Sequence, residues 1–296
     1  MSSRRDFLKQ TLAAGILAGS APLTIPAATV TRRSATDWVT LGNSGVKVTR
    51  LAFGTGTHGG RVQRELGQEE FTRLVRHAYD RGIRFFETAS SYRGMPEMLS
   101  IALKGIPRDS YRFLTKLRSS EATDLPNAVD MLRRELNTEY IDIVLLHCVR
   151  TKGWAEEFKP IRDIFSEAKV KKQILAHGAS CHGTLPLSDF PSTKWLDVAQ
   201  LRVNNAGVKM DTLRGDDRDK GDVPKITATI GEIHGQGTGV IGMKIMGEGR
   251  FTEPEQRDAS IKFVMGLGTV DAVTIGYKSI GEIDEAIERI NTHLNS

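Results

Sequence analysis

The segment RFFETASSYRG, residues 84–94, joins an apolar run to a polar turn that ends in glycine. Phe85 and Phe86 belong to the kind of run that a strand buried on both faces requires. Glu87 and Tyr92 follow, five residues apart, where the apolar run stops. The pattern predicts a buried strand whose end and following loop carry a carboxylate and a phenol.

Seven further apolar runs of this kind occur along the chain, and segments with helical spacing, such as Phe71, Leu74, Val75 and Ala78, separate most of them. Eight alternations of strand and helix favour an α/β fold of the closed (β/α)8 TIM barrel type over an open doubly wound sheet. The seven runs are RLAFGT (50–55), RFLTKL (112–117), IDIVLLHC (141–148), ILAHGAS (174–180), DVAQLRVN (197–204), GVIGMKI (239–245) and AVTIGY (272–277).

Local signals place the remaining elements. WVTLGNSGVKVT (38–49) has two short β-like runs around a Gly-Asn-Ser-Gly turn, which predicts an N-terminal β-hairpin. Asp124 and Ser279 are candidate helix N-caps, and Glu282 completes a capping-box pattern with Ser279. Residues 205–222 are polar and predict a long loop. No linker interrupts residues 37–296, so we expect one domain.

Composition excludes several classes of protein. With 296 residues, of which 39% are hydrophobic and 26% charged, the chain can bury a full core. The net charge of +5 is dispersed beyond the first ten residues, so we expect no nucleic-acid partner. Only two cysteines are present, and the seven histidines show no metal-ligand spacing. We therefore predict neither a disulfide scaffold nor a metal site.

Residues 1–30 resemble a twin-arginine export signal. SRRDFLK (3–9) pairs two arginines with Phe-Leu-Lys, and a short Ala/Gly-rich stretch follows it. Pro22 and Pro26 interrupt that stretch, so no stable membrane span is expected. The segment predicts the twin-arginine translocation machinery as a partner and a periplasmic or otherwise exported location. A basic or frayed N-terminus is the alternative, and retention as an anchor stays open.

Side chains with catalytic chemistry lie at the predicted ends of consecutive strands. In a (β/α)8 barrel the active site lies at the carboxyl ends of the strands. Glu87, Lys116, His147 and Ser180 occupy such ends, and Tyr92 lies in the loop after Glu87. A Tyr hydroxyl has a pKa of about 10, which a nearby ammonium lowers. We expect Lys116 to lower the pKa of Tyr92 and His147 to hydrogen-bond a substrate oxygen.

From Trp38 onward the sequence resembles the aldo-keto reductase superfamily. LGNSGVKVTRLAFGT, RFFETASSYRG, FLTKL, IDIVLLH, HGAS and DVAQLRVN occur in the family's order and spacing. The resemblance implies NAD(P)H-dependent reduction of an aldehyde or ketone, or oxidation of the alcohol, with Tyr92 as general acid/base. Lys116 and His147 correspond to the family's other catalytic residues, and Glu87 stands in place of its aspartate. A small carbonyl compound is the implied substrate.

The same resemblance implies a dinucleotide site. Its predicted contacts are Ser180, Cys181, Gln200, Lys244, Lys278, Ser279 and Glu282, with Ser180 and Gln200 on the nicotinamide carboxamide. Cys181 replaces the family's asparagine, and MKIMGEG (243–249) replaces a proline-bearing stretch. Glu282 stands roughly where the family often has Arg or Gln, and a carboxylate there would repel a 2′-phosphate. We expect NADP or NAD, with family habit favouring NADP slightly.

Other interpretations of these residues remain open. Glu87 and Lys116 could form a structural ion pair, and His147 could be a core histidine. Trp154, in the loop after His147, is expected to form part of the pocket wall, and His58 is a further candidate lining residue. The rival function is a dinucleotide-binding or sensing protein that has lost turnover. A third possibility keeps the barrel but assigns it a lyase or hydrolase reaction.

Overall fold

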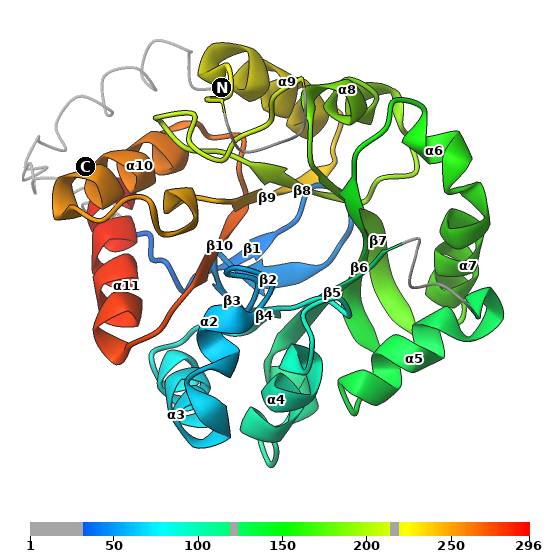
Figure 1. Cartoon of the computed structure of the whole chain (residues 1–296), viewed down its shortest axis with the longest axis horizontal. Helices are drawn as coiled ribbons and strands as arrows, with labels where there is room; N and C mark the ends of the chain where they lie inside the picture. Colours follow the sequence, from blue (N-terminus) through cyan, green and yellow to red (C-terminus); the bar gives the residue numbers. More distant parts are fainter. Residues whose placement is uncertain (1–31, 119–123, 214–218) are drawn as a thin grey trace, which may run out of the picture. The chain divides into compact units, whose positions relative to one another are not determined.

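Eight parallel strands close into one barrel, seen nearly end-on in Figure 1. The order around the barrel is β10-β3-β4-β5-β6-β7-β8-β9, and pairing of β10 with β3 completes it. The predicted (β/α)8 barrel is therefore confirmed. The strands are β3 (Leu51–Gly54), β4 (Phe85–Glu87), β5 (Arg112–Leu117), β6 (Ile141–Val149), β7 (Ile174–Cys181), β8 (Val198–Arg202), β9 (Gly239–Met243) and β10 (Ala272–Gly276).

This computed structural model describes residues 32–118, 124–213 and 219–296. The predicted export signal at residues 1–30 lies outside the described residues, as does part of the polar segment 205–222. Within the described ranges, no helix combines the length and apolarity that crossing a membrane requires. The same ranges contain no cluster of three or more His, Cys, Asp and Glu side chains that could hold a metal ion.

The predicted hairpin forms and closes the amino-terminal end of the barrel. Strands β1 (Trp38–Thr40) and β2 (Lys47–Thr49) pair in antiparallel register. Leu41, Val46 and Val48 of this hairpin pack against side chains that point into the barrel, including Phe85 and Ile143. The hairpin therefore closes the amino-terminal end of the barrel interior, and the carboxyl end is left for a site.

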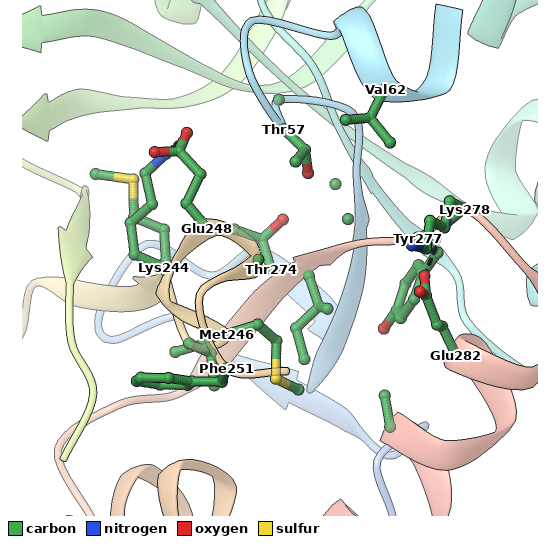
Figure 2. Close-up of a pocket in the computed structure, with 18 of the residues that line it drawn as sticks. Thr57, Val62, Lys244, Met246, Glu248, Phe251, Thr274, Tyr277, Lys278 and Glu282 are labelled. Atoms are coloured by element: carbon green, nitrogen blue, oxygen red, sulfur yellow. Dashed lines mark hydrogen bonds and ion pairs between the residues drawn. The ribbon is translucent and has the colours of Figure 1, made fainter. Parts of the chain in front are cut away.

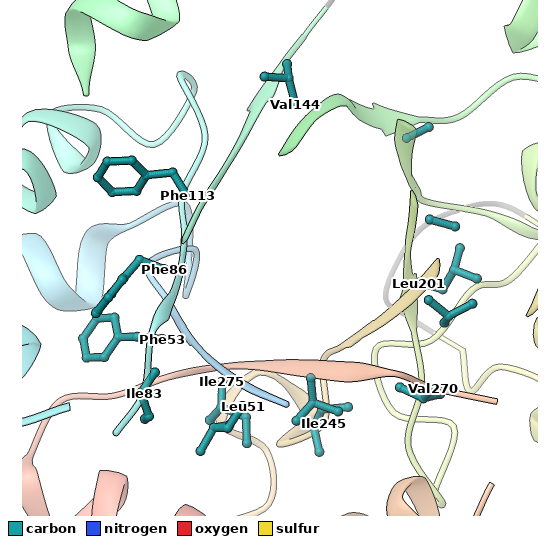
Figure 3. Close-up of a cluster of buried hydrophobic side chains, with 14 of the residues drawn as sticks. Leu51, Phe53, Ile83, Phe86, Phe113, Val144, Leu201, Ile245, Val270 and Ile275 are labelled. Carbon is teal, nitrogen blue, oxygen red and sulfur yellow. The ribbon is translucent and has the colours of Figure 1, made fainter. Parts of the chain in front are cut away.

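Helices surround the barrel, as expected from the helical spacing between the strands (Figure 1). Their apolar faces pack on the outer side of the sheet, where Phe53, Phe86 and Phe113 belong to one large core (Figure 3). The helices are α2 (Arg61–Arg64), α3 (Gly67–Asp80), α4 (Met95–Ala102), α5 (Ala128–Glu135), α6 (Trp154–Glu157), α7 (Lys159–Val170), α8 (Thr184–Leu187), α9 (Val223–Gly235), α10 (Pro254–Gly266) and α11 (Ile280–Leu294).

The two predicted helix starts differ in outcome. Ser279 is the N-cap of α11, where its hydroxyl accepts a hydrogen bond from the backbone N–H of Glu282 at 3.3 Å. The Glu282 carboxylate accepts from the Lys278 backbone N–H, so the reciprocal capping-box bond to Ser279 does not form. Asp124 makes no cap bond: its carboxylate accepts from the Asn127 side chain at 2.8 Å, and α5 begins only after a 3-10 turn.

Strand pleating decides which residues enter the site. Successive side chains of a strand point to opposite faces, so positions two apart share the barrel interior. Phe85, Leu114 and Ile143 lie in the inner core. Counting on by twos from such positions gives Glu87 on β4, Lys116 on β5 and His147 on β6, all buried at the carboxyl end. The fold thus brings the predicted strand-end residues to one mouth.

Candidate active site

Glu87 is the last residue of β4 and forms a buried ion pair with Lys116. Its other carboxylate oxygen, Oε2, accepts a hydrogen bond from the Thr274 hydroxyl at 3.2 Å. The Glu87 side chain therefore has polar partners on two sides, although only 4% of the residue is exposed. Sequence reasoning missed Thr274, which counting by twos from the inner-core residue Ala272 could have found.

Lys116 lies on β5 and is 1% exposed. Its ammonium donates to Glu87 and, at 2.8 Å, to the backbone carbonyl of Thr88. Nζ also lies 5.0 Å from the centroid of the Tyr92 ring. Burial lowers the pKa of Lys116 well below its usual value, and the charge of Lys244 lowers it further. The carboxylate of Glu87, the ammonium of Lys116 and the ring of Tyr92 thus lie next to one another, as expected.

Tyr92 lies in the loop between β4 and α4 and lines a groove at the barrel mouth. Among the described residues, no hydrogen-bond partner of its hydroxyl is found. Gly56 packs against the phenol so closely that a Cβ atom there would lie 2.6 Å from the hydroxyl oxygen. A side chain at position 56 would therefore displace Tyr92.

The pKa of Tyr92 is raised, and the expectation that Lys116 lowers it is wrong. Burial is the main cause, and the charge of Arg118 opposes it only in part. Lys116 meets the face of the ring, and its charge is balanced by Glu87. The phenol is consequently neutral at physiological pH and retains its proton.

His147 approaches Tyr92 edge to face, with the ring centroids 5.4 Å apart and the planes at 84°. Its Nδ1 is 2.9 Å from the hydroxyl oxygen of Ser91, a partner that sequence reasoning missed although it lies next to Tyr92 in the chain. Burial lowers the pKa of His147 well below its usual value, and the nearby charge of Lys116 adds to this effect. The imidazole is therefore neutral.

Ser180 does not line the groove; its hydroxyl contacts the backbone of β6 next to His147. Strand β6 has an irregularity between Leu146 and Val149, where Cys148 adopts a positive φ of 63°. The Ser180 hydroxyl accepts from the Cys148 backbone N–H at 2.7 Å and lies 3.4 Å from the Leu146 carbonyl oxygen. Ser180 thereby stabilises the bulge that directly follows His147.

Cys181, a predicted cofactor contact, and Trp154, a predicted residue of the pocket wall, are both buried away from the groove. Cys181 is fully buried in the core between strands and helices, and its thiol donates to the Gly183 carbonyl at 3.3 Å. It therefore does not line the groove, because the pleat turns it outward where Ser180 turns inward. Trp154 is also fully buried, with its ring 5.1 Å from that of Phe190, so the prediction that it forms a pocket wall is wrong.

The groove has a volume of about 690 Å³ and runs from the Tyr92 mouth across β9 and β10 to the start of α11. Figure 2 shows Lys244 and Glu248 at one side, with Lys278 and Glu282 at the other. The volume lies within the range of small-molecule and cofactor sites. Of the predicted residues, the groove is lined by Glu87, Tyr92, Gln200, Lys244, Lys278, Glu282 and the candidate His58.

Gln200 provides a buried acceptor at the deep end of the groove. The residue is 1% exposed, and its amide oxygen has no hydrogen-bond partner among the described residues. A buried polar atom without a partner costs free energy, so this oxygen suits a ligand that donates a hydrogen bond. Beside it, Lys244 contacts Glu248 at 2.6 Å in a loop where both residues have positive φ.

The far end of the groove carries an acidic side chain beside a helix start. Glu282 accepts from the Lys278 backbone N–H at 2.8 Å, and both residues line the groove. Ser279 does not line it, since its hydroxyl caps α11. Arg257 and Arg289 also line this end, and each pairs with Glu285 at 2.9 Å and 2.8 Å, respectively. Their charges are therefore already balanced in part.

Comparison with known proteins shows the family of this chain. A sequence model of the Aldo/keto reductase family matches residues 50–291. L-galactose dehydrogenase of Arabidopsis thaliana is 34% identical over 118 residues, which are 36% of each chain. The alignments with the first curated relatives span less than half of each relative's length.

Solved structures resemble the whole barrel. An aldo-keto reductase structure from Pseudomonas aeruginosa is similar with a TM-score of 0.70 at 19% identity, covering 89% of this chain and 98% of the other. An aldo-keto reductase from Klebsiella pneumoniae, solved in complex with NADPH, has a TM-score of 0.61 at 15% identity, with coverages of 87% and 89%. At these identities the likeness concerns the fold.

Proposed function

The chain belongs to the Aldo/keto reductase family, and from this premise we propose that it is an NAD(P)H-dependent oxidoreductase that reduces the carbonyl group of an aldehyde or ketone. One observation carries the proposal: the phenol of Tyr92 lines one end of a long groove, and its ring contacts the neutral imidazole of His147 and the buried ammonium of Lys116. Turnover of an aldehyde panel with NADPH and with NADH, followed by loss of reduced-nicotinamide absorbance, tests it.

The groove fits a dinucleotide. Gln200 offers an unpartnered buried oxygen that a carboxamide N–H can satisfy, and the groove extends from there to the helix start at Lys278. A reduced nicotinamide bound with its ring beside Tyr92 would supply a hydride to the carbonyl carbon. We propose NADP or NAD as the cofactor. Mass spectrometry of small molecules released by denaturing the purified protein distinguishes the two and tests whether the cofactor is retained.

Tyr92 has the properties of the proton donor. Tyr92 lines the groove and its raised pKa keeps the phenol protonated, so it can protonate the carbonyl oxygen as negative charge develops there. His147 is neutral and can hydrogen-bond the same oxygen, with Ser91 holding the ring at Nδ1. Lys116, oriented by Glu87, lies over the phenol and stabilises the phenolate left after proton transfer.

A second function, dinucleotide binding without turnover, is favoured by one feature. Lys116 donates to Glu87 and to the Thr88 carbonyl, and it approaches the ring of Tyr92 without a hydrogen bond to its hydroxyl. A phenol with a raised pKa is a weak acid, and this would slow proton transfer. If the protein binds a dinucleotide tightly and reduces no member of a broad carbonyl panel, this second function replaces the first.

We also propose that the protein is exported by the twin-arginine route. The sequence SRRDFLK at residues 3–9 and the weakly apolar stretch after it support this. Replacing Arg4 and Arg5 by lysine in the full chain should retain the protein in the cytoplasm of a bacterium that has this pathway. Export of the variant at the level of the original sequence would contradict the proposal.

A further inference from the structure

Basic groups occupy the position directly after β7 and the last position of β8. Counting by twos from Ser180 reaches His182, and from Gln200 it reaches Arg202. The two side chains, at the ends of neighbouring strands, contact each other between Arg202 Nη2 and His182 Nδ1. No role in the reaction proposed above uses either residue.

This contact fixes which ring nitrogen of His182 carries the proton. A guanidinium can only donate, so Nδ1 of His182 accepts and the ring proton is on Nε2. Arg202 is 3% exposed and lies 3.8 Å from Asp211, whose carboxylate also accepts from the Gly183 backbone N–H at 2.7 Å. Asp211 and Arg202 are therefore positioning residues that leave the Nε2–H of His182 as a donor.

The charged side chains that most affect the pKa values of His147 and His182 are all basic. The charged side chains that most lower the pKa of His147 are Lys116, Arg118, Lys244 and Arg150. His182 is affected by Arg202, Lys244 and Arg150, and no acidic side chain is among the main causes for either imidazole. Both rings thus lie in a positive potential, which attracts an anion.

Arg150 is an exposed member of this group. It directly follows β6, it is exposed, and its Nε donates to the Cys148 thiol at 3.2 Å. Lys116, Lys244 and Arg202 have acidic neighbours in Glu87, Glu248 and Asp211. No acidic side chain of the described residues forms an ion pair with Arg150.

We propose that Arg150 and His182 form a subsite for a carboxylate on the carbonyl substrate, so that the protein acts on keto acids or aldehyde acids. Arg150 offers a planar fork of N–H donors that matches a carboxylate. His182 offers Nε2–H from the end of the neighbouring strand β7, and its backbone N–H donates to the carbonyl of Val149, the residue before Arg150, at 3.0 Å. Arg150 directly follows β6, the strand that carries His147, and a carboxylate held there would orient the carbonyl group toward His147 and Tyr92. The inference rests on the proposed reductase function and names its substrate class.

A matched pair of substrates tests the subsite. With the full chain and either reduced dinucleotide, kcat/KM for 4-carboxybenzaldehyde should exceed that for its methyl ester by about tenfold or more, the effect of one charge-assisted hydrogen bond. Arg150→Gln should lower this ratio by a similar factor. Arg134→Gln, which removes an exposed arginine on α5, should leave the ratio unchanged and serves as the matched control.

The outcomes separate the two proposals. Equal rates for acid and ester, unaffected by Arg150→Gln, would overturn the subsite and leave the reductase function standing. A preference for glyceraldehyde 3-phosphate over glyceraldehyde without a preference for the carboxylate would overturn the assignment to carboxylates. If neither aldehyde is reduced, calorimetric titration with 4-carbamoylbenzoate and with terephthalamide shows whether the subsite exists without the reaction. Binding of the acid alone, lost in Arg150→Gln, would support the subsite while the reductase function fails. Binding of neither compound would overturn both proposals.

Discussion

The ammonium of Lys116 lies 5.0 Å from the centre of the Tyr92 ring, on its face and not at its hydroxyl. Glu87 holds the ammonium in that position from β4, and the Thr88 carbonyl holds it from the following residue. The cation therefore stabilises negative charge in the ring of Tyr92, a residue that lines the groove, without a hydrogen bond to its hydroxyl. This arrangement gives the phenol a proton to donate and a nearby charge that stabilises the anion left behind.

Replacing Tyr92 by phenylalanine should lower kcat by roughly 10² to 10⁴, the range that a positioned general acid contributes. Dinucleotide affinity should change little, because the substitution removes only the hydroxyl. Steady-state kinetics and a fluorescence titration with the dinucleotide measure the two effects. Tyr140→Phe, on a tyrosine outside the groove, is the matched control. A variant with wild-type kcat would show that another group donates the proton.

Breaking the ion pair between Glu87 and Lys116 should destabilise the fold. Both side chains are buried, so Glu87→Gln leaves a buried ammonium without its counter-charge, and the free energy of unfolding should fall by about 3–5 kcal/mol. Urea unfolding measures this. The double variant Glu87→Gln with Lys116→Met should lose less than the two single variants together, since neither charge is then left alone. Strict additivity would mean that the pair is not coupled.

The pH dependence of stability should reflect the buried imidazoles. The pKa of His147 and that of His182 lie well below 6.5 in the folded protein, so the unfolded chain binds more protons than the native one as the pH falls below 6.5. Stability contributed by these groups is complete above the unfolded pKa and is lost as the pH falls. The free energy of unfolding should decrease between about pH 7 and 5, and His147→Gln should make that slope shallower. An unchanged slope in the variant would contradict a depressed pKa.

Glu282 should decide the choice between NADP and NAD. Its carboxylate lies at the far end of the groove beside Lys278, where it would repel a 2′-phosphate. Glu282→Gln should raise the affinity for NADPH relative to NADH by about tenfold, equal to roughly 1.4 kcal/mol. Dissociation constants for both dinucleotides measure the ratio. Ala286 lines the same end, and a ratio that responds to Ala286→Asn but not to Glu282→Gln would place the discrimination there.

Sequence pattern was sufficient to predict the barrel because its strands need burial on both faces. Runs such as IDIVLLHC and RFLTKL are apolar throughout, and few structures other than a parallel sheet covered by helices bury such runs. The hairpin at 38–49 was equally predictable, since glycines mark its turn. The start of α5 was not, because Asp124 bonds the Asn127 side chain in preference to the helix backbone.

Only the site residues at strand ends could be predicted, because the alternation of side chains along a strand places them. Glu87, Lys116 and His147 follow from strand ends, and the structure brings them together as expected. The outward turn of Cys181 and the bulge at Cys148 depend on the register between β6 and β7, and a single sequence does not determine that register. The raised pKa of Tyr92 was missed for a related reason: it results from burial, and burial depends on how the loop folds over the groove.

The most direct test of the account is deuteride transfer from 4-deuterated NADPH or NADH to 4-carboxybenzaldehyde, with the product analysed by mass spectrometry. We expect one deuterium in the alcohol formed by the wild type, and almost none with Tyr92→Phe although that variant still binds the dinucleotide. A wild-type protein that binds the dinucleotide but transfers no deuterium to this aldehyde or to any carbonyl in a broad panel would contradict it. Such a result would identify the barrel as a dinucleotide-binding protein.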